Sequence, residues 1–189
     1  EIYTLSLHDA LPISNTNTNA NAADSVSVGR STTAAAEAAT AMGSATTANG
    51  SNSVAMGSSA IANGASSTAI GRQATTAAEA NNAVSVGFQT SANAADSIAV
   101  GRGANTAAAA TYATAVGHTA RANEQHALAI GSSSTANGAS STAIGRVATA
   151  SGRAATALGT NVQATAATSV AIGSNTTADK ENSVALGSN

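Results

Sequence analysis

Hydrophobic and small polar residues alternate in a short segment that recurs along almost the whole chain. In residues 169–173 the order is Ser, Val, Ala, Ile and Gly. Neighbouring copies end 14 residues apart, except for two steps of 16, from Gly71 to Gly87 and from Gly101 to Gly117. A short fixed period predicts a repeat architecture, in which each unit buries its apolar face against its neighbours. We expect the glycines that end the twelve copies to be structural turn residues: Gly29, Gly43, Gly57, Gly71, Gly87, Gly101, Gly117, Gly131, Gly145, Gly159, Gly173 and Gly187.

The alternation within each segment has a period of two, which places successive side chains on opposite faces of an extended strand. A second, shorter strand is expected five residues after each glycine, where Ala recurs except at Thr76 and Thr106 of the two long repeats. Asn-Gly pairs at 49–50, 63–64 and 137–138 indicate turns that use positive φ. Strand, corner, strand and corner in 14 residues predict one turn of a β-solenoid. Stacked at roughly 4.8 Å, twelve turns make a rod on the order of 60 Å long.

Two other folds are weighed against the solenoid. Residues 34–39 have the composition of an Ala-rich helix. However, a glycine every 14 residues would cost such a helix about 1 kcal/mol each time, and the sequence has no apolar stripe of period 3.6. The abundance of Ala, Ser, Thr, Asn and Gly is also typical of disorder. A disordered chain would have no reason to keep a large aliphatic residue at one position of every repeat.

The two sets of side chains that alternate along each strand differ in size. Ser or Ala occupies the first and third positions, and large aliphatic residues or Thr occupy the second and fourth. Because only small side chains fit the thin space between the two strands of one turn, we expect the small set inside the coil. The aliphatic residues of the fourth position then form an exposed strip and are the candidates for a core shared between chains: Val28, Met42, Met56, Ile70, Val86, Val100, Val116, Ile130, Ile144, Leu158, Ile172 and Leu186.

Such a strip exceeds the few hundred Å² of apolar surface that a soluble monomer exposes. Burial of each Val or Ile contributes about 1.5–3 kcal/mol, so partner chains are expected to cover it. Thr replaces the second-position residue in five copies, which places the fourth position nearer the shared axis. The alternative is a wider coil, with the large residues inside and the small ones exposed.

Residues 169–175 (Ser-Val-Ala-Ile-Gly-Ser-Asn) and 182–187 (Asn-Ser-Val-Ala-Leu-Gly) resemble the head repeats of trimeric autotransporter adhesins, the YadA-like heads. The resemblance extends over residues 20–189 and implies an all-β fold, a homotrimer of left-handed parallel β-rolls of about twelve 14-residue turns. It also implies a position above the bacterial outer membrane on a coiled-coil stalk. The two 16-residue repeats depart from the family pattern, and the sequence holds no neck, stalk or membrane anchor.

The N-terminal residues lack the repeat. Residues 1–13 contain the single Pro of the chain and resemble a translated sequencing adapter, so we expect residues 1–14 to be a non-native tail. The alternative is a native capping segment. Residues 14–21 are polar and fit either a frayed lead-in or the outer strand of an earlier turn. Residues 15–189 form one domain of head repeats, and we expect the chain to be a fragment.

Composition and charge argue against several functions. Seven Lys and Arg against nine Asp and Glu give no basic surface for nucleic acid, and no apolar run has the roughly 20 residues of a membrane-spanning helix. The sequence has no Cys, and His118 and His126 fall at corner positions without metal-ligand spacing. No Ser has a positioned base and an orienting carboxylate. We therefore expect no enzyme activity, no catalytic residues, no metal and no cofactor.

Candidate ligand contacts come from the long repeats and from the corners. The extra residues must leave the coil within 75–82 and 105–112, and loops on a rigid scaffold often carry recognition. The two aromatic residues of the repeat region, Phe88 and Tyr112, and a row of arginines that follow the repeated glycines complete the set of candidates: Arg30, Arg72, Arg102 and Arg146. The alternatives are packing of the aromatic rings against a neighbouring turn or chain, and a role of the arginines in solubility or in pairing between chains.

The family resemblance implies a bacterial cell-surface adhesin head, exported through the outer membrane, that attaches to extracellular-matrix proteins, host cells or other bacteria. Repetition along the rod and on three chains would supply avidity from weak single sites. A passive spacer within a surface fibre is the alternative. An ice-binding solenoid is a third hypothesis, but Val54, Val84 and Ile98 interrupt the array of Thr residues that it needs.

Overall fold

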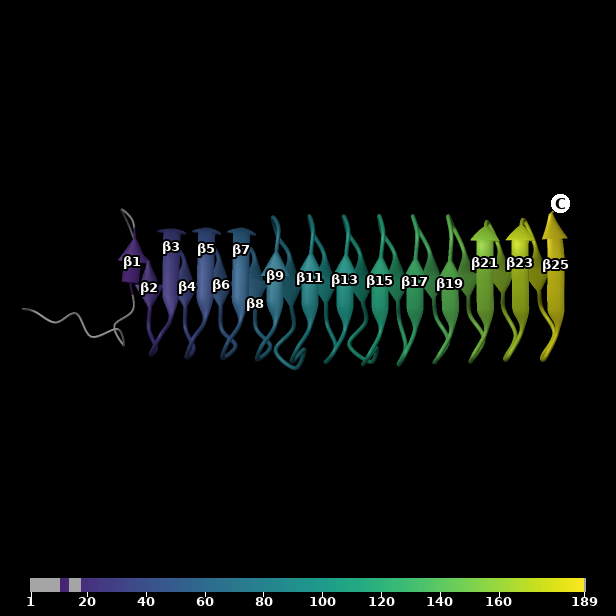
Figure 1. The fold of residues 1–189 in the computed structure, drawn as a ribbon, viewed down its shortest axis with the longest axis horizontal. Helices are drawn as coiled ribbons and strands as arrows, with labels where there is room; N and C mark the ends of the chain where they lie inside the picture. The colour runs from purple at the N-terminus through teal and green to yellow at the C-terminus, as the bar shows by residue number, and fades with distance from the viewer. Residues whose placement is uncertain (1–10, 14–17, 189) are drawn as a thin grey trace, which may run out of the picture.

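The chain folds as a parallel β-solenoid in which every element is a short strand. The structure is a computed structural model that describes residues 11–13 and 18–188. Odd-numbered strands form a 13-stranded parallel sheet and even-numbered strands a 12-stranded parallel sheet, each in sequence order (Figure 1). The predicted all-β solenoid with two strands per turn is therefore confirmed, and neither a helix nor disorder describes residues 18–188.

The 13-stranded sheet contains the longer strands: β1(Leu11–Ile13), β3(Val26–Arg30), β5(Thr40–Ser44), β7(Val54–Ser58), β9(Thr68–Ile70), β11(Val84–Val86), β13(Ile98–Val100), β15(Thr114–Val116), β17(Leu128–Ile130), β19(Thr142–Ile144), β21(Thr156–Thr160), β23(Val170–Ser174) and β25(Val184–Ser188). The 12-stranded sheet contains two-residue strands: β2(Asn19–Ala20), β4(Thr33–Ala34), β6(Thr47–Ala48), β8(Ile61–Ala62), β10(Thr75–Thr76), β12(Ser91–Ala92), β14(Asn105–Thr106), β16(Arg121–Ala122), β18(Thr135–Ala136), β20(Thr149–Ala150), β22(Gln163–Ala164) and β24(Thr177–Ala178).

Equivalent residues of successive repeats lie beside each other in the sheets. In β19 and β21, for example, Ala143 pairs with Ala157 and Ile144 with Leu158. The sequence period therefore sets the register, and each position of the repeat becomes a column that runs along the rod. The left-handed sense of the coil stays a prediction.

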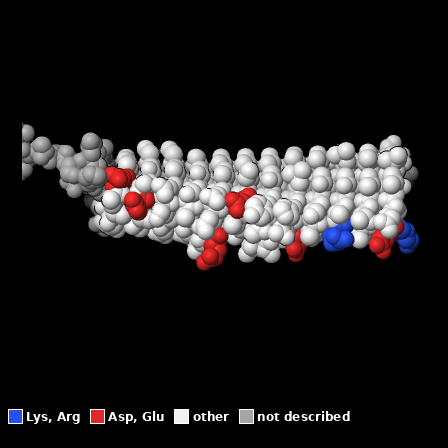
Figure 2. Space-filling model, turned by 60° about the horizontal axis from the view of Figure 1, so that its bottom comes forward, with Lys and Arg blue, Asp and Glu red and all other residues white. Residues whose placement is uncertain are grey.

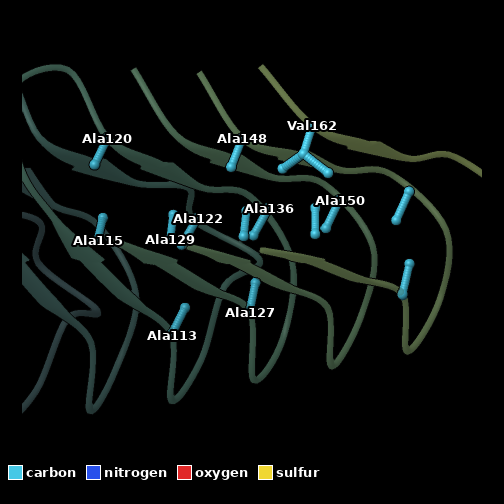
Figure 3. Close-up of a cluster of buried hydrophobic side chains, with 14 of the residues drawn as sticks. Ala113, Ala115, Ala120, Ala122, Ala127, Ala129, Ala136, Ala148, Ala150 and Val162 are labelled. Carbon is cyan, nitrogen blue, oxygen red and sulfur yellow. The ribbon is translucent and has the colours of Figure 1, made fainter. Parts of the chain in front are cut away.

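The interior of the coil is built from small side chains, as predicted. Ala129 and Ala143 are fully buried, whereas Ile130 is 37% exposed on the opposite face of the same sheet. Alanine methyl groups from the two sheets point toward each other across the interior (Figure 3). The largest fully buried side chain is that of Val162. The alternative of a wider coil with the large residues inside is therefore wrong, because the large aliphatic residues lie on the outer face of the sheet and the small residues fill the interior.

One interior column was not expected from the sequence. It lies three residues after each repeated glycine and holds Ala, Thr, Ser or Val: Thr32, Thr46, Ala60, Ala74, Thr90, Ala104, Ala120, Ser134, Ala148 and Val162 are all buried. Together with the small residues of both strands, this column closes the coil at the corner that follows each glycine.

The repeated glycines are required by close approach and by backbone conformation. Gly117 has a φ of +134°, and a Cβ atom placed on it would lie 2.5 Å from the carbonyl oxygen of Gly131 in the next turn. Contacts between Cβ and other atoms are essentially never shorter than 3.0 Å. A side chain at this position would thus collide with the backbone of the next turn.

The Asn-Gly pairs act differently from the prediction. Gly50, Gly64 and Gly138 do not have positive φ; the residues two positions later, such as Asn52, do. Glycine is needed at these positions because an added Cβ of Gly50 would collide with the carbonyl oxygen of Gly64. The prediction that these pairs supply positive φ is wrong, because the left-handed conformation falls on the residue just before the buried start of the next strand.

The two long turns carry their extra residues at one corner, within the predicted ranges. Ala78 and Glu79 are exposed between Ala77 and Ala80, and the Ala80 N–H donates to the Ala77 carbonyl at 3.1 Å. The second long turn repeats this arrangement, with Ala108 and Ala109 exposed and Ala110 donating to Ala107 at 3.0 Å. A local hydrogen bond therefore closes each insertion, and the strands on either side keep their register.

The two threonines that replace Ala in the long turns are buried and hydrogen bonded. Thr76 Oγ1 accepts the Asn63 N–H at 3.1 Å and lies 2.8 Å from Ser67 Oγ. In the ordinary turn before it, the equivalent N–H of Asn49 donates to the backbone carbonyl of Ala62. The threonine hydroxyl thus takes the place of a carbonyl that the insertion moves away, and Thr106 repeats the arrangement with Asn93 and Ser97.

The described N-terminal residues add one more layer to each sheet. β2 pairs with β4, so part of the polar lead-in is the outer strand of an earlier turn. β1 pairs with β3 through Leu11–Val26 and Ile13–Val28. Residues 1–10 and 14 of the predicted tail lie outside the described residues. The non-native origin of residues 1–14 stays a prediction.

Candidate binding surfaces

The rod offers three surfaces with distinct chemistry: one sheet face and two corners. We call the outer face of the 13-stranded sheet the aliphatic face. We call residues one to three positions after each repeated glycine the glycine corner. The residues between each even-numbered strand and the next odd-numbered strand form the insert corner, which contains both insertions.

The aliphatic face displays the predicted column of large residues. None of the twelve is buried within the chain, and Met56, Ile70 and Ile172 are 36–37% exposed. Leu186 is 69% exposed, because no following strand of this chain stacks on β25. The column at the second position lies beside it; Val54 and Thr142 are half-buried, whereas Ile98 is exposed. The result is a continuous apolar strip along the whole rod.

The glycine corner is basic and carries a stacked cluster. The guanidinium carbon of Arg72 lies 4.2 Å from the centre of the Phe88 ring, and that of Arg102 lies 5.8 Å from it. The three residues occupy the same position of successive turns, so the ring sits between two cations along the rod. Cation–π contact of this kind contributes about 0.5–1 kcal/mol at an exposed site. Phe88 is half-buried by these contacts, and both arginines are exposed.

The arginine row extends beyond this cluster. Arg30 and Arg146 occupy the same corner position in other turns, and both are exposed. His118 is exposed in the turn after Arg102. The structure describes no Asp or Glu at the glycine corner.

The insert corner is predominantly acidic. Figure 2 shows acidic side chains spread along this surface and basic ones only toward the C-terminal end. All seven Asp and Glu of the described residues lie at this corner: Asp24, Glu37, Glu79, Asp96, Glu124, Asp179 and Glu181. Its two cations are Arg153 and Lys180. Within the described residues, the acidic groups are therefore confined to the insert corner, and four of the seven Lys and Arg lie at the glycine corner.

Tyr112 also lies at the insert corner, directly beyond the second insertion. It is 57% exposed, and its ring stacks on that of His126 in the next turn, with centroids 5.2 Å apart and planes 7° from parallel. Its φ is +60°, a left-handed conformation that is unusual for a bulky residue. Tyr112 is exposed and Phe88 is half-buried, and the two residues lie at opposite corners. The alternative of packing against a neighbouring turn describes the contacts of both rings.

The contacts that involve Phe88 and Tyr112 were not foreseen from the sequence. Each joins residues 14 or 16 positions apart in the same column, so an alignment of the successive repeats one above another would have found them. The same reading finds ladders of exposed Asn side chains, in which Asn123 donates to Asn137 at 2.6 Å and Asn49 to Asn63 at 2.7 Å. These ladders tie neighbouring turns together at the insert corner.

Metal-ligand clusters and membrane-spanning helices are both absent from the described residues. No three His, Asp or Glu side chains among them gather closely enough to hold a metal ion. No helix within residues 18–188 has the length and apolar character to cross a bilayer. His118 and His126 lie in different corners, in keeping with their expected corner positions.

Comparison with known proteins identifies the repeat. The family model described as the YadA head domain repeat matches residues 34–60, 48–74, 62–81, 78–104, 108–134, 122–148, 136–161 and 164–189. Among solved structures, the chain is similar to the collagen-binding domain of the Yersinia adhesin YadA, with a TM-score of 0.53 and 30% sequence identity. That match spans 57% of this chain and 57% of the other. The comparison with curated proteins gives no match.

Proposed function

Because the chain belongs to the family of YadA head domain repeats, we propose that it is the head of a trimeric adhesin on the bacterial outer surface. Its ligands in this proposal are extracellular-matrix proteins, host cells or other bacteria. The Yersinia domain to which it is similar binds collagen, and this supports a matrix protein as the first ligand to test. Adhesins of this family are surface-exposed autotransporters, which supports export through the outer membrane.

The observation that carries the trimer is the aliphatic face. None of the Val, Ile, Leu and Met side chains at the fourth position is buried in the single chain, and Met56, Ile70 and Ile172 are 36–37% exposed. Burial of the remaining third would contribute about 0.5–1 kcal/mol for each residue, a third of the value for a fully exposed side chain, and twelve turns repeat the same gain. Partner chains that cover this face leave the 12-stranded sheet facing outward.

The insert corner is where we place specific recognition. Ala108 and Ala109 stand out from the rod beside Tyr112, whose ring is exposed on a rigid scaffold. Aromatic side chains of this kind often dominate the free energy of an interface. The other candidates, Phe88 and the arginines of the glycine corner, stay predictions as ligand contacts. Weak sites repeated on three chains would together hold a surface by avidity.

Two deletions of whole turns test this proposal. Removal of residues 102–117 takes out a 16-residue turn with its insertion and Tyr112, and joins Gly101 to His118. Removal of residues 146–159 takes out a plain 14-residue turn and joins Gly145 to Thr160. Both deletions shorten the rod by one turn, roughly 4.8 Å, so they differ in the insertion and not in length.

Attachment is measured as retention of the purified chain on immobilised collagen, fibronectin and host cells, and as clumping of bacteria that display it. We expect the first deletion to lower retention several-fold and the second to leave it unchanged. Equal retention by both deleted chains and the intact chain would contradict recognition at the second insertion. No retention of the intact chain on any of these surfaces would contradict the adhesin proposal and favour the passive spacer.

A further inference from the structure

The acidic and basic groups at the two ends of one strand lie too far apart to pair within one chain. Asp96 precedes β13 and Arg102 follows it, so six residues of extended backbone separate them. At about 3.3 Å per residue they lie roughly 20 Å apart, more than twice the Debye length of about 8 Å at physiological salt. Asp24 and Arg30 hold the same places at the two ends of β3. These charges therefore cannot attract each other across their own sheet.

Both groups of the β13 pair are held in place at their corners. Asn82 donates to Asp96 Oδ1 at 3.0 Å, which fixes the carboxylate at the insert corner. The Arg102 guanidinium lies over Phe88, and a stacked guanidinium keeps its N–H groups in its own plane, where they can bond to a carboxylate. Asp96 and Arg102 are both exposed. Each is thus ready to pair with a group outside the chain.

The way in which copies cover the aliphatic face decides which corners meet. If rods pack in parallel around a common axis, the strands of each chain run toward the next, and the glycine corner of one meets the insert corner of its neighbour. If two rods pack antiparallel, face to face, glycine corners meet each other. The second arrangement would bring arginines against arginines, and like charges placed together are destabilising.

We propose that Arg102 pairs with Asp96 of the neighbouring copy, at the seam where the glycine corner of one parallel rod lies against the insert corner of the next at the same turn. The pairing rests on the proposed trimer and names the ion pair of its seam. Arg30 and Asp24 hold the same two places at the ends of β3, five strands away in the same sheet.

Disulfide cross-linking tests which corners meet, because the chain has no Cys of its own. Asn52 and Ser58 lie at the two ends of β7, at the positions that Asp96 and Arg102 hold on β13. Both are exposed. Their separation within one chain, roughly 20 Å, exceeds the limit of about 7 Å between Cα atoms for a disulfide, so any bond must join two copies.

Under mild oxidation, the double variant Asn52→Cys with Ser58→Cys should give covalent trimers on a non-reducing denaturing gel, and each single variant should stay monomeric. A dimer of the Ser58→Cys variant would mean that like corners meet and would overturn the proposal. Light scattering separates the remaining outcomes. A trimer by light scattering without cross-links contradicts the seam alone, and a monomer at every concentration contradicts both the trimer and the seam.

Charge reversal tests the pair itself. Arg102→Asp should raise the dissociation constant for each contact between chains about fivefold, the upper range for an exposed ion pair. Asp96→Arg should do the same, and the double reversal should restore the original value. In 1 M NaCl the differences should vanish, because the Debye length falls to about 3 Å. Arg121→Asp, on the outer face of the other sheet, is the matched control, and an equal effect there or no rescue in the double variant would refute the pair.

Discussion

Replacement of Gly117 by Ala tests whether the close approach of neighbouring turns is the reason why glycine recurs at this position of the repeat. The added Cβ would lie 2.5 Å from the Gly131 carbonyl oxygen, far inside the 3.4 Å at which ordinary contact begins. The backbone oxygen cannot swing away as a flexible side chain could. We therefore expect the two turns to move apart at this point.

The cost has two parts. A non-glycine residue at a φ of +134° costs on the order of 1–3 kcal/mol. Separation of the turns weakens the ladder bonds on either side, in which Gly117 donates to Val100 and Gly131 donates to Val116, each at 2.8 Å. At about 1 kcal/mol for each bond, the total loss in the free energy of unfolding is about 3–5 kcal/mol.

Two other glycines separate these parts. Gly187 has a φ of +143° with nothing within 4 Å of its added Cβ, so Gly187→Ala measures backbone strain alone. Gly103 has a φ of +66°, and its added Cβ meets Thr119 Cγ2 at an ordinary 3.5 Å, so Gly103→Ala should cost about 1 kcal/mol. Urea unfolding followed by circular dichroism gives the global values at one protein concentration, and hydrogen exchange of the Gly117 and Gly131 amides gives the local ones. A loss for Gly117→Ala no larger than that for Gly103→Ala would refute the reasoning.

Three further substitutions test the interior, the long turns and the aliphatic face. Ala143→Leu should lower the thermal midpoint, because overpacking of an interior filled by Ala and Ser costs about 1–3 kcal/mol or more, whereas Thr142→Leu on the outer face of the same strand should change it little. Thr76→Val removes the hydroxyl that bonds Asn63 and Ser67 and should cost about 1–3 kcal/mol in urea unfolding; Thr76→Ser should recover most of the loss, and equal values for the two would contradict the role of the hydroxyl. Ile130→Asp should abolish association in sedimentation equilibrium while the circular dichroism spectrum stays unchanged. Gln163→Asp on the other sheet should leave both the association and the spectrum unchanged.

The sequence predicts the parts of the fold that are local to one repeat. Parity within a strand distinguishes Ala143 from Ile144, and the size of the two sets decides which faces inward. The period then gives the register directly, because residues 14 positions apart must stack. These inferences need no knowledge of how the corners are built, and the structure confirms them.

The backbone conformation of the corners was harder to predict, because residues of many types adopt it. The left-handed positions hold Ala38, Gln73, Tyr112 and Val147 as well as Asn52, so no single residue type reveals them. The Asn-Gly pairs drew attention to the wrong residue for this reason. Contacts such as Arg72 with Phe88 join neighbouring turns within one column, and the sequence shows them only when its repeats are aligned one above another.

The two corners of the coil differ in how much change they accept, and this difference assigns them separate roles. At the glycine corner, three residues separate each repeated glycine from the next short strand in all eleven turns. That length is fixed because the glycines of successive turns lie too close for any side chain, and an interior residue closes the corner. The insert corner accepts two more residues in two turns, because a local hydrogen bond closes the loop. Insertions and substitutions that serve recognition can therefore be accommodated at the insert corner, while the aliphatic face and the glycine corner keep the geometry that assembly requires.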